Sequence, residues 1–141
     1  MLRLVIDTDV MVAALESSAG ASRQVLEGVL RGEASLLLST ALLLEYEAVL
    51  TRPAVLDRSG LSGADVTKIL DELARICTAV AFDYRWRPLA NDSDDDFVVE
   101  TAINGTADVI VSFNIRDMAA GAGRFGIAVE RPAEVLRRMR R

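Results

Sequence analysis

Short apolar runs alternate along the chain with longer segments whose apolar residues recur at helical spacing. The short runs predict buried strands at residues 2–6, 35–38, 78–82 and 108–111, with a weaker edge strand at 127–129. Helical spacing and capping residues predict helices at residues 10–15, 22–30, 41–51, 62–77, 92–103 and 114–120, with a last helix from residue 132. Loops are expected around residues 57–63, 83–90 and 121–126.

This alternation predicts a domain of the α/β class. Successive βαβ units give a mostly parallel sheet of four or five strands with helices on both faces, which is a three-layer α/β/α arrangement. The length of 141 residues suits one domain spanning residues 1–141. Ligands of such sheets bind at the carboxyl ends of the strands, so polar residues at those positions are the first candidates for a functional site.

Composition narrows the chemistry that such a site can perform. The chain has no histidine, one cysteine (Cys77) and one lysine (Lys68). A Ser–His–Asp triad, an imidazole acid–base pair and a zinc site rich in histidine or cysteine are therefore excluded. Catalysis through a covalent lysine intermediate is disfavoured. The 21 Asp and Glu residues leave carboxylate chemistry.

Charge and hydropathy bear on partners and location. A net charge of −5 disfavours broad electrostatic binding of nucleic acid, so any such binding is expected to be local or metal-mediated. No apolar run approaches the length of a transmembrane helix. Asp7 interrupts the first apolar run too early for a signal peptide, and we therefore expect a cytoplasmic location.

Two acidic residues stand at positions that suggest a site. Asp7 comes at the carboxyl end of the first predicted strand, where capping of the following helix is the alternative role. Glu45 shares a helical face with Ala41 and Val49. A carboxylate on such an apolar face needs a cation or a hydrogen-bond donor, unless it reaches water at the edge of the face or pairs with an arginine.

A run of acidic residues, Asp92, Asp94, Asp95 and Asp96, crowds the first turn of one predicted helix. The helix dipole favours one or two acids at this position, but four repel one another unless a cation is close. Helical phase places Asp95 toward the core, Asp92 and Asp96 at its flanks, and Asp94 toward solvent.

Two further polar residues, Asn114 and Asp117, follow the strand expected at 108–111, although each alone is also typical of a turn. With Asp7, Glu45 and Asp95 they are expected on one rim of the sheet. Carboxylate and amide oxygens without histidine or cysteine suit Mg²⁺ or Mn²⁺.

On these residues the sequence resembles the PIN-domain family, in particular the bacterial toxins of toxin–antitoxin pairs that are related to the VapC ribonucleases. The resemblance runs along nearly the whole chain. It is carried by four segments in order, Val5–Val10, Glu45–Pro53, Asp92–Asp96 and Ala107–Asp117. Where the family usually has asparagine, this chain has Asp9.

The resemblance implies a PIN-like fold and a metal-dependent endoribonuclease. It implies that Asp7, Glu45 and Asp95 gather Mg²⁺ or Mn²⁺, with further ligands drawn from Asp92, Asp96, Asn114 and Asp117. The expected reaction is attack of a metal-activated water on single-stranded or structured RNA, leaving a 5′-phosphate and a 3′-hydroxyl. The implied partners are the RNA substrate, a cognate antitoxin protein and a second copy of the chain in a homodimer.

Two other functions remain open. A PIN fold with incomplete metal ligation would serve as a binding module without turnover. The sequence Asp7-Thr8-Asp9 is also similar to phosphatases that use an aspartate nucleophile, which need a lysine near a later acidic pair, and Lys68 is the only candidate.

Two basic segments of the chain bear on RNA binding. Arg85, Trp86 and Arg87 are candidates for stacking on and clamping RNA, although packing of this loop against the domain is the favoured interpretation. The arginine-rich carboxyl end is interpreted as a solvated helix face rather than an RNA-binding patch.

Overall fold

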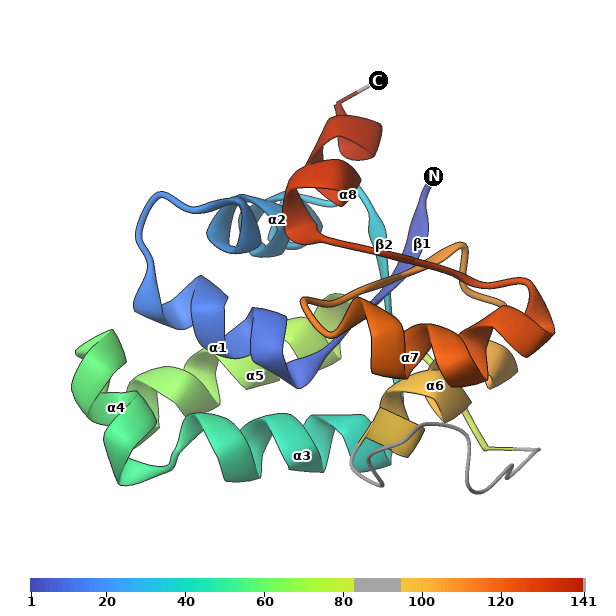
Figure 1. The fold of residues 1–141 in the computed structure, drawn as a ribbon. Coiled ribbons are helices and arrows are strands. Elements are labelled where there is room, and N and C mark those ends of the chain that lie inside the picture. Colours follow the sequence, from blue (N-terminus) through green and yellow to red (C-terminus); the bar gives the residue numbers. More distant parts are fainter. Residues whose placement is uncertain (83–94, 141) are drawn as a thin grey trace.

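The computed structural model describes residues 1–82 and 95–140, and of Asp95 and Asp96 it describes the backbone (Figure 1). The expectations for Asp92 and for the loop with Arg85, Trp86 and Arg87 lie outside the described residues.

A five-stranded sheet forms the centre of the described part of the chain. Its order is β3-β2-β1-β4-β5, and every neighbouring pair is parallel. The strands are β1 (Arg3–Ile6), β2 (Ser35–Leu38), β3 (Thr78–Ala79), β4 (Val109–Val111) and β5 (Ala128–Glu130). The central strands β1, β2 and β4 are almost entirely buried, which explains why they read as continuous apolar runs.

Helices cover both faces of this sheet. They are α1 (Thr8–Glu16), α2 (Ala21–Leu30), α3 (Thr40–Leu50), α4 (Pro53–Ser59), α5 (Gly63–Ile76), α6 (Asp95–Asn104), α7 (Ile115–Ala122), the 3₁₀ turn η1 (Gly123–Phe125) and α8 (Pro132–Met139). The helices α6 and α7 pack together, whereas α2 packs on α1 and α8, and α3 packs on α1 and α5 (Figure 1). The expected three-layer α/β/α fold with a parallel sheet is confirmed.

The loop expected at 57–63 is confirmed only at 60–62, because α4 runs to Ser59 and α5 begins at Gly63. Pro53 stands in the first turn of α4, where its fixed φ favours a helix start. Val55 is buried and anchors the helix, and Gly60 ends it in the left-handed conformation at φ 74°. A helix this short carries too little periodic pattern to stand out in the sequence.

Other boundaries also differ from expectation. The helix expected at 22–30 begins one residue earlier, at Ala21, with Gly20 as its N-cap, and Ser22 is buried inside it. The strand expected at 78–82 is only two residues long. It consists of Thr78 and Ala79, which are exposed at the edge of the sheet. The segment 121–126 is largely helical, since α7 runs to Ala122 and η1 follows.

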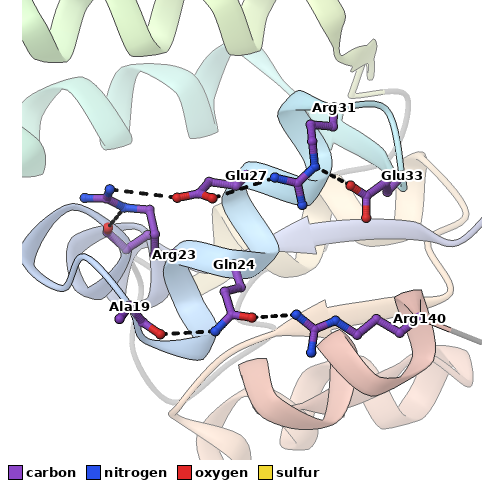
Figure 2. A network of polar contacts seen from close by, with 8 residues as sticks. Ala19, Arg23, Gln24, Glu27, Arg31, Glu33 and Arg140 are labelled. Atoms are coloured by element: carbon purple, nitrogen blue, oxygen red, sulfur yellow. Dashed lines mark hydrogen bonds and ion pairs between the residues drawn. The ribbon is translucent and has the colours of Figure 1, made fainter.

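Polar contacts fix α2 to its neighbours (Figure 2). The Gln24 amide donates to the carbonyl of Ala19 at 3.1 Å and accepts from Arg140 Nη2 at 2.6 Å. Arg23 Nε donates to the carbonyl of Ala14 at 2.6 Å, which ties α2 to α1. Arg138 also pairs with Glu130 at 2.7 Å. Arg138 and Arg140, both near the carboxyl end, therefore make contacts within the domain.

None of the helices that the structure describes combines the length and apolar character needed to cross a membrane.

Candidate active site

The carboxylate of Asp7 lies at the carboxyl end of β1 and is 5% exposed. Asp7 is the N-cap of α1, and its Oδ1 accepts a hydrogen bond from the backbone of Thr8 at 2.7 Å. Its Oδ2 accepts from Ser112 Oγ, at the end of β4, at 2.6 Å. Asp7 therefore has the capping role, and it also stands at the strand end where a parallel sheet places its ligands.

Burial and, after it, the nearby charge of Asp9 raise the pKa of the Asp7 carboxyl from 3.8 to about 7. The hydrogen bonds from Ser112 and Thr8 act in the opposite direction. A carboxylate that is removed from water and lies beside a second carboxylate is stabilised by a bound cation. This pair therefore has the electrostatic character expected of a metal site.

The loop between β4 and α7 is fastened to the start of α1. Asp9 Oδ2 accepts from the backbone N–H of Phe113 at 3.2 Å, and Ser112 Oγ accepts from the backbone of Asn114 at 2.9 Å. Asn114 is the N-cap of α7, and Asp117 stands in the first turn of that helix. The structure thus brings Asn114 close to Asp7 through one shared hydroxyl, with Asp117 less than one turn further on.

Tyr46 connects Asp7 with Glu45. The Tyr46 side chain is fully buried in α3 and donates a hydrogen bond to the carbonyl of Ile6, the residue before Asp7. Burial raises the pKa of Tyr46 well above its ordinary value, and the charges of Asp7 and Glu45 add to this effect. The charges of both carboxylates therefore act on the same phenol, which lies between the end of β1 and α3.

The first turn of α6 lies next to Glu45. Half-buried Glu45 and Phe97 both line a groove of about 440 Å³ between α3 and α6. Asp95 is the first residue of α6, two positions before Phe97. The side chains of Asp95 and Asp96 are outside the described part, as is Asp92, so their role as ligands remains a prediction.

The described side chains form only part of the expected ligand set. Among them, no group of three His, Cys, Asp or Glu side chains is arranged to hold a metal ion. The residues present nevertheless fit a hard cation, because Asp7 and Asp9 supply carboxylate oxygens in a buried setting. Thr8 Oγ1 is buried beside them and makes no hydrogen bond to the described residues.

Sequence reasoning missed three features around this site. Asp9 accepts a hydrogen bond from the backbone of Phe113. Its position two residues after Asp7 is the sequence feature that could have indicated a role at the site. Tyr46 bonds to the carbonyl of Ile6, and in the sequence it is one residue of an apolar helix with no separate signal. Glu100 is 0% exposed in α6, and its signal was an acid in the middle of an apolar stretch. The sequence pattern did not supply the complete burial of Tyr46 and Glu100 or the contact that Asp9 makes.

The lysine required by a phosphatase with an aspartate nucleophile is placed unfavourably. Lys68 is exposed in the middle of α5, and its charge acts on Asp65, near the start of that helix.

A family model described as PIN domain matches residues 3–116 of the chain. The chain belongs to the PIN domain family. The match spans β1, α3 and β4, which are the elements that carry Asp7, Glu45 and Ser112 in this PIN domain. The expected family resemblance is confirmed.

The fold is also shared with a solved structure. This PIN domain is similar to a chain in the crystal structure of VapBC2 from Rickettsia felis bound to a DNA fragment from their promoter. The TM-score is 0.62 with 14% sequence identity, covering 92% of this PIN domain and 98% of that chain. At this identity the likeness concerns the fold. No curated protein matches the sequence.

Proposed function

We propose that this PIN domain is a metal-dependent endoribonuclease. The observation that carries the proposal is the Asp7 carboxylate, which is buried at the carboxyl end of β1 beside Asp9 with its pKa raised to about 7. A protein keeps a carboxylate in such a setting at a cost in stability unless a cation or proton is bound there. Perturbed acids of this kind gather at functional sites.

The proposed ligands of Mg²⁺ or Mn²⁺ are Asp7, Glu45 and Asp95. Further candidates, which complete or orient the ligand set, are Asp92, Asp96, Asn114 and Asp117. A bound divalent ion supplies an acidified water and neutralises charge on the phosphate undergoing attack. The absence of histidine supports this choice, because the chain has no imidazole to act as a general base.

The other residues of the site are proposed to position these ligands. Ser112 holds one oxygen of Asp7 and the backbone of Asn114, so it fixes the end of β1 relative to α7. Tyr46 fixes the backbone just before Asp7. The buried hydroxyl of Thr8 is available to a water or a phosphate oxygen.

We further propose that this PIN domain is the toxin of a toxin–antitoxin pair and has an antitoxin protein as partner. The similarity in fold to a chain of the VapBC2 structure supports this assignment. A homodimer is proposed on the family resemblance alone. Purification with the product of a small open reading frame adjoining the gene would test the antitoxin, since a toxin is expected to copurify with it as a complex.

The test of the nuclease is cleavage of a single-stranded RNA in the presence of Mn²⁺. The wild type is expected to leave 5′-phosphate and 3′-hydroxyl ends, and Asp7→Asn is expected to abolish cleavage while the protein remains folded. Asp57→Asn is the matched control, because Asp57 is exposed on α4. Undiminished cleavage by Asp7→Asn would refute the assignment.

The same preparation separates the other two functions. A binding module without turnover would bind RNA but show neither cleavage nor tight uptake of Mn²⁺ in calorimetry. A phosphatase would release phosphate from a small aryl phosphate, which the proposed nuclease is expected to leave intact.

A further inference from the structure

A groove of about 330 Å³ opens next to the candidate active site. Its walls come from α1, the start of α2, the loop between β4 and α7, and the start of α8. Ala13 and Ser17 line it, and they follow Asp9 at four-residue intervals, so Asp9 and Ala13 lie along one side of α1, with Ser17 at its C-cap. The groove therefore continues from the acidic end of α1, and its volume is that of a small ligand pocket.

Phe113 forms the wall of the groove that is nearest to the carboxylates. Its side chain is 46% exposed, which makes it one of four exposed large hydrophobic residues in the described part of the chain. Its backbone N–H is bound to Asp9 Oδ2 at 3.2 Å, and the preceding residue, Ser112, donates to Asp7. An apolar ring is thus held in contact with water immediately beside the proposed metal ligands.

Arg131 supplies positive charge to the same groove. It is exposed at the N-cap of α8, and none of the described acidic side chains forms an ion pair with its guanidinium. By contrast, Arg138 of the same helix is paired with Glu130 at 2.7 Å. In a chain with net charge −5, a polyanion needs local cations of this kind.

We propose that this groove binds one nucleotide of a single-stranded RNA next to the scissile phosphate, an inference that rests on the nuclease function proposed above. The base stacks on Phe113, and the adjoining phosphate contacts Arg131. The apolar wall suits a base, the exposed Arg131 guanidinium suits a phosphate, and the continuity with Asp9 fixes where the strand enters the site. Because every base has a face that stacks, this position is expected to accept all four bases.

Steady-state cleavage of a fluorescent single-stranded RNA with Mn²⁺ tests the ring. Phe113→Ala is expected to raise KM about 5-fold or more, as loss of one stacked base predicts, with kcat changed less than about 2-fold. Phe113→Trp is expected to keep the wild-type KM. Phe125→Ala is the matched control, because Phe125 is another exposed phenylalanine but lies on η1 and does not line the groove.

The salt dependence of KM tests the arginine. Loss of one phosphate contact on a single strand is expected to reduce the slope of log KM against log salt concentration by about 0.7 in Arg131→Gln. Arg137→Gln is the matched control, because Arg137 is exposed on α8 outside the groove. A merely structural role of Arg131 would not change this slope.

The outcomes separate this inference from the proposed function. If the wild type cleaves RNA but both groove variants match their controls in KM and salt slope, the nucleotide subsite is refuted and the nuclease stands. If the wild type does not cleave, anisotropy of the same RNA without divalent metal decides the subsite. Weaker binding by Phe113→Ala and Arg131→Gln would support the subsite there, and equal binding would refute it.

Discussion

Ser112 Oγ donates a hydrogen bond to Asp7 Oδ2 at 2.6 Å, joining two residues that are 105 positions apart in the chain. Their strands, β1 and β4, are neighbours in the sheet, so the contact forms as a consequence of the strand order. The same hydroxyl accepts from the backbone of Asn114 at 2.9 Å. One serine therefore links the proposed metal ligand to the start of α7.

Replacement of Ser112 by alanine is expected to remove both hydrogen bonds and to change the packing volume little. The fold should lose about 1–3 kcal/mol, because a buried carboxylate oxygen and a backbone N–H lose their partner. The pKa of Asp7 should rise further, since the Ser112 bond lowers it in the wild type. Urea denaturation measures the first effect, with Ser18→Ala, at an exposed position of the α1–α2 connection, as the control. A free energy of unfolding equal to that of the control would contradict this role.

The metal-free protein is expected to lose stability as the pH rises. The pKa of the Asp7 carboxyl is 3.8 in an unfolded chain and about 7 in the folded protein, so the folded state binds the proton more tightly. The contribution of the Asp7 proton to the free energy of unfolding is fully present below about pH 4 and is lost as the pH rises through about 7. The loss between pH 5 and 7 is about 2 kcal/mol.

Thermal or urea unfolding in a metal chelator at several pH values measures this dependence. Asp7→Asn is expected to flatten it, because the amide does not titrate, whereas Asp57→Asn should not. Addition of Mn²⁺ at neutral pH should recover the lost stability of the wild type. A wild type that becomes more stable over this pH range would show that the Asp7 pKa is not raised.

Removal of the Tyr46 hydroxyl is expected to destabilise the junction between β1 and α1. Tyr46→Phe leaves the carbonyl of Ile6 without its donor in a buried position, at a cost of about 1–3 kcal/mol. The denaturant slope should stay unchanged, since the ring still fills its place in the core. Stability equal to the wild type would indicate that this bond does not hold the backbone before Asp7.

The sequence predicts the sheet better than the helix ends, for a physical reason. The strands β1, β2 and β4 are buried on both faces, so their apolar runs are continuous and their places are clear. The short helix α4 has one buried residue, Val55, and ends at Gly60. A sequence with so few apolar positions is difficult to distinguish from that of a loop.

For the candidate site, too, the sequence pattern predicts some residues but not the contacts between them. Asp7 could be predicted because it follows a strand directly, and the apolar face of α3 pointed to Glu45. The bonds of Ser112 to Asp7 and of Asp9 to Phe113 join β1 and α1 to the end of β4, so they depend on which strands are neighbours. Linear spacing does not contain that information.

The close approach of the chain at Gly105 gives a further test of the fold. A Cβ there would lie 2.9 Å from side-chain atoms of Leu37 and Val80 and 3.0 Å from the carbonyl of Thr101. Gly105→Ala is therefore expected to destabilise the protein by about 1–3 kcal/mol. Gly63→Ala is the control, because nothing lies within 4 Å of its Cβ position, and denaturation midpoints compare the two. Equal midpoints would contradict the packing of α6 against β2.

The most direct test of a carboxylate metal site in this PIN domain compares two neighbouring glutamates of α3. Glu45 is half-buried and its charge acts on Tyr46, whereas Glu47 is exposed. The rate of Mn²⁺-dependent cleavage of a single-stranded RNA is expected to fall by about 100-fold or more in Glu45→Gln, as loss of a metal ligand predicts, and to stay at the wild-type level in Glu47→Gln. Equal rates in the two variants would contradict the proposed site.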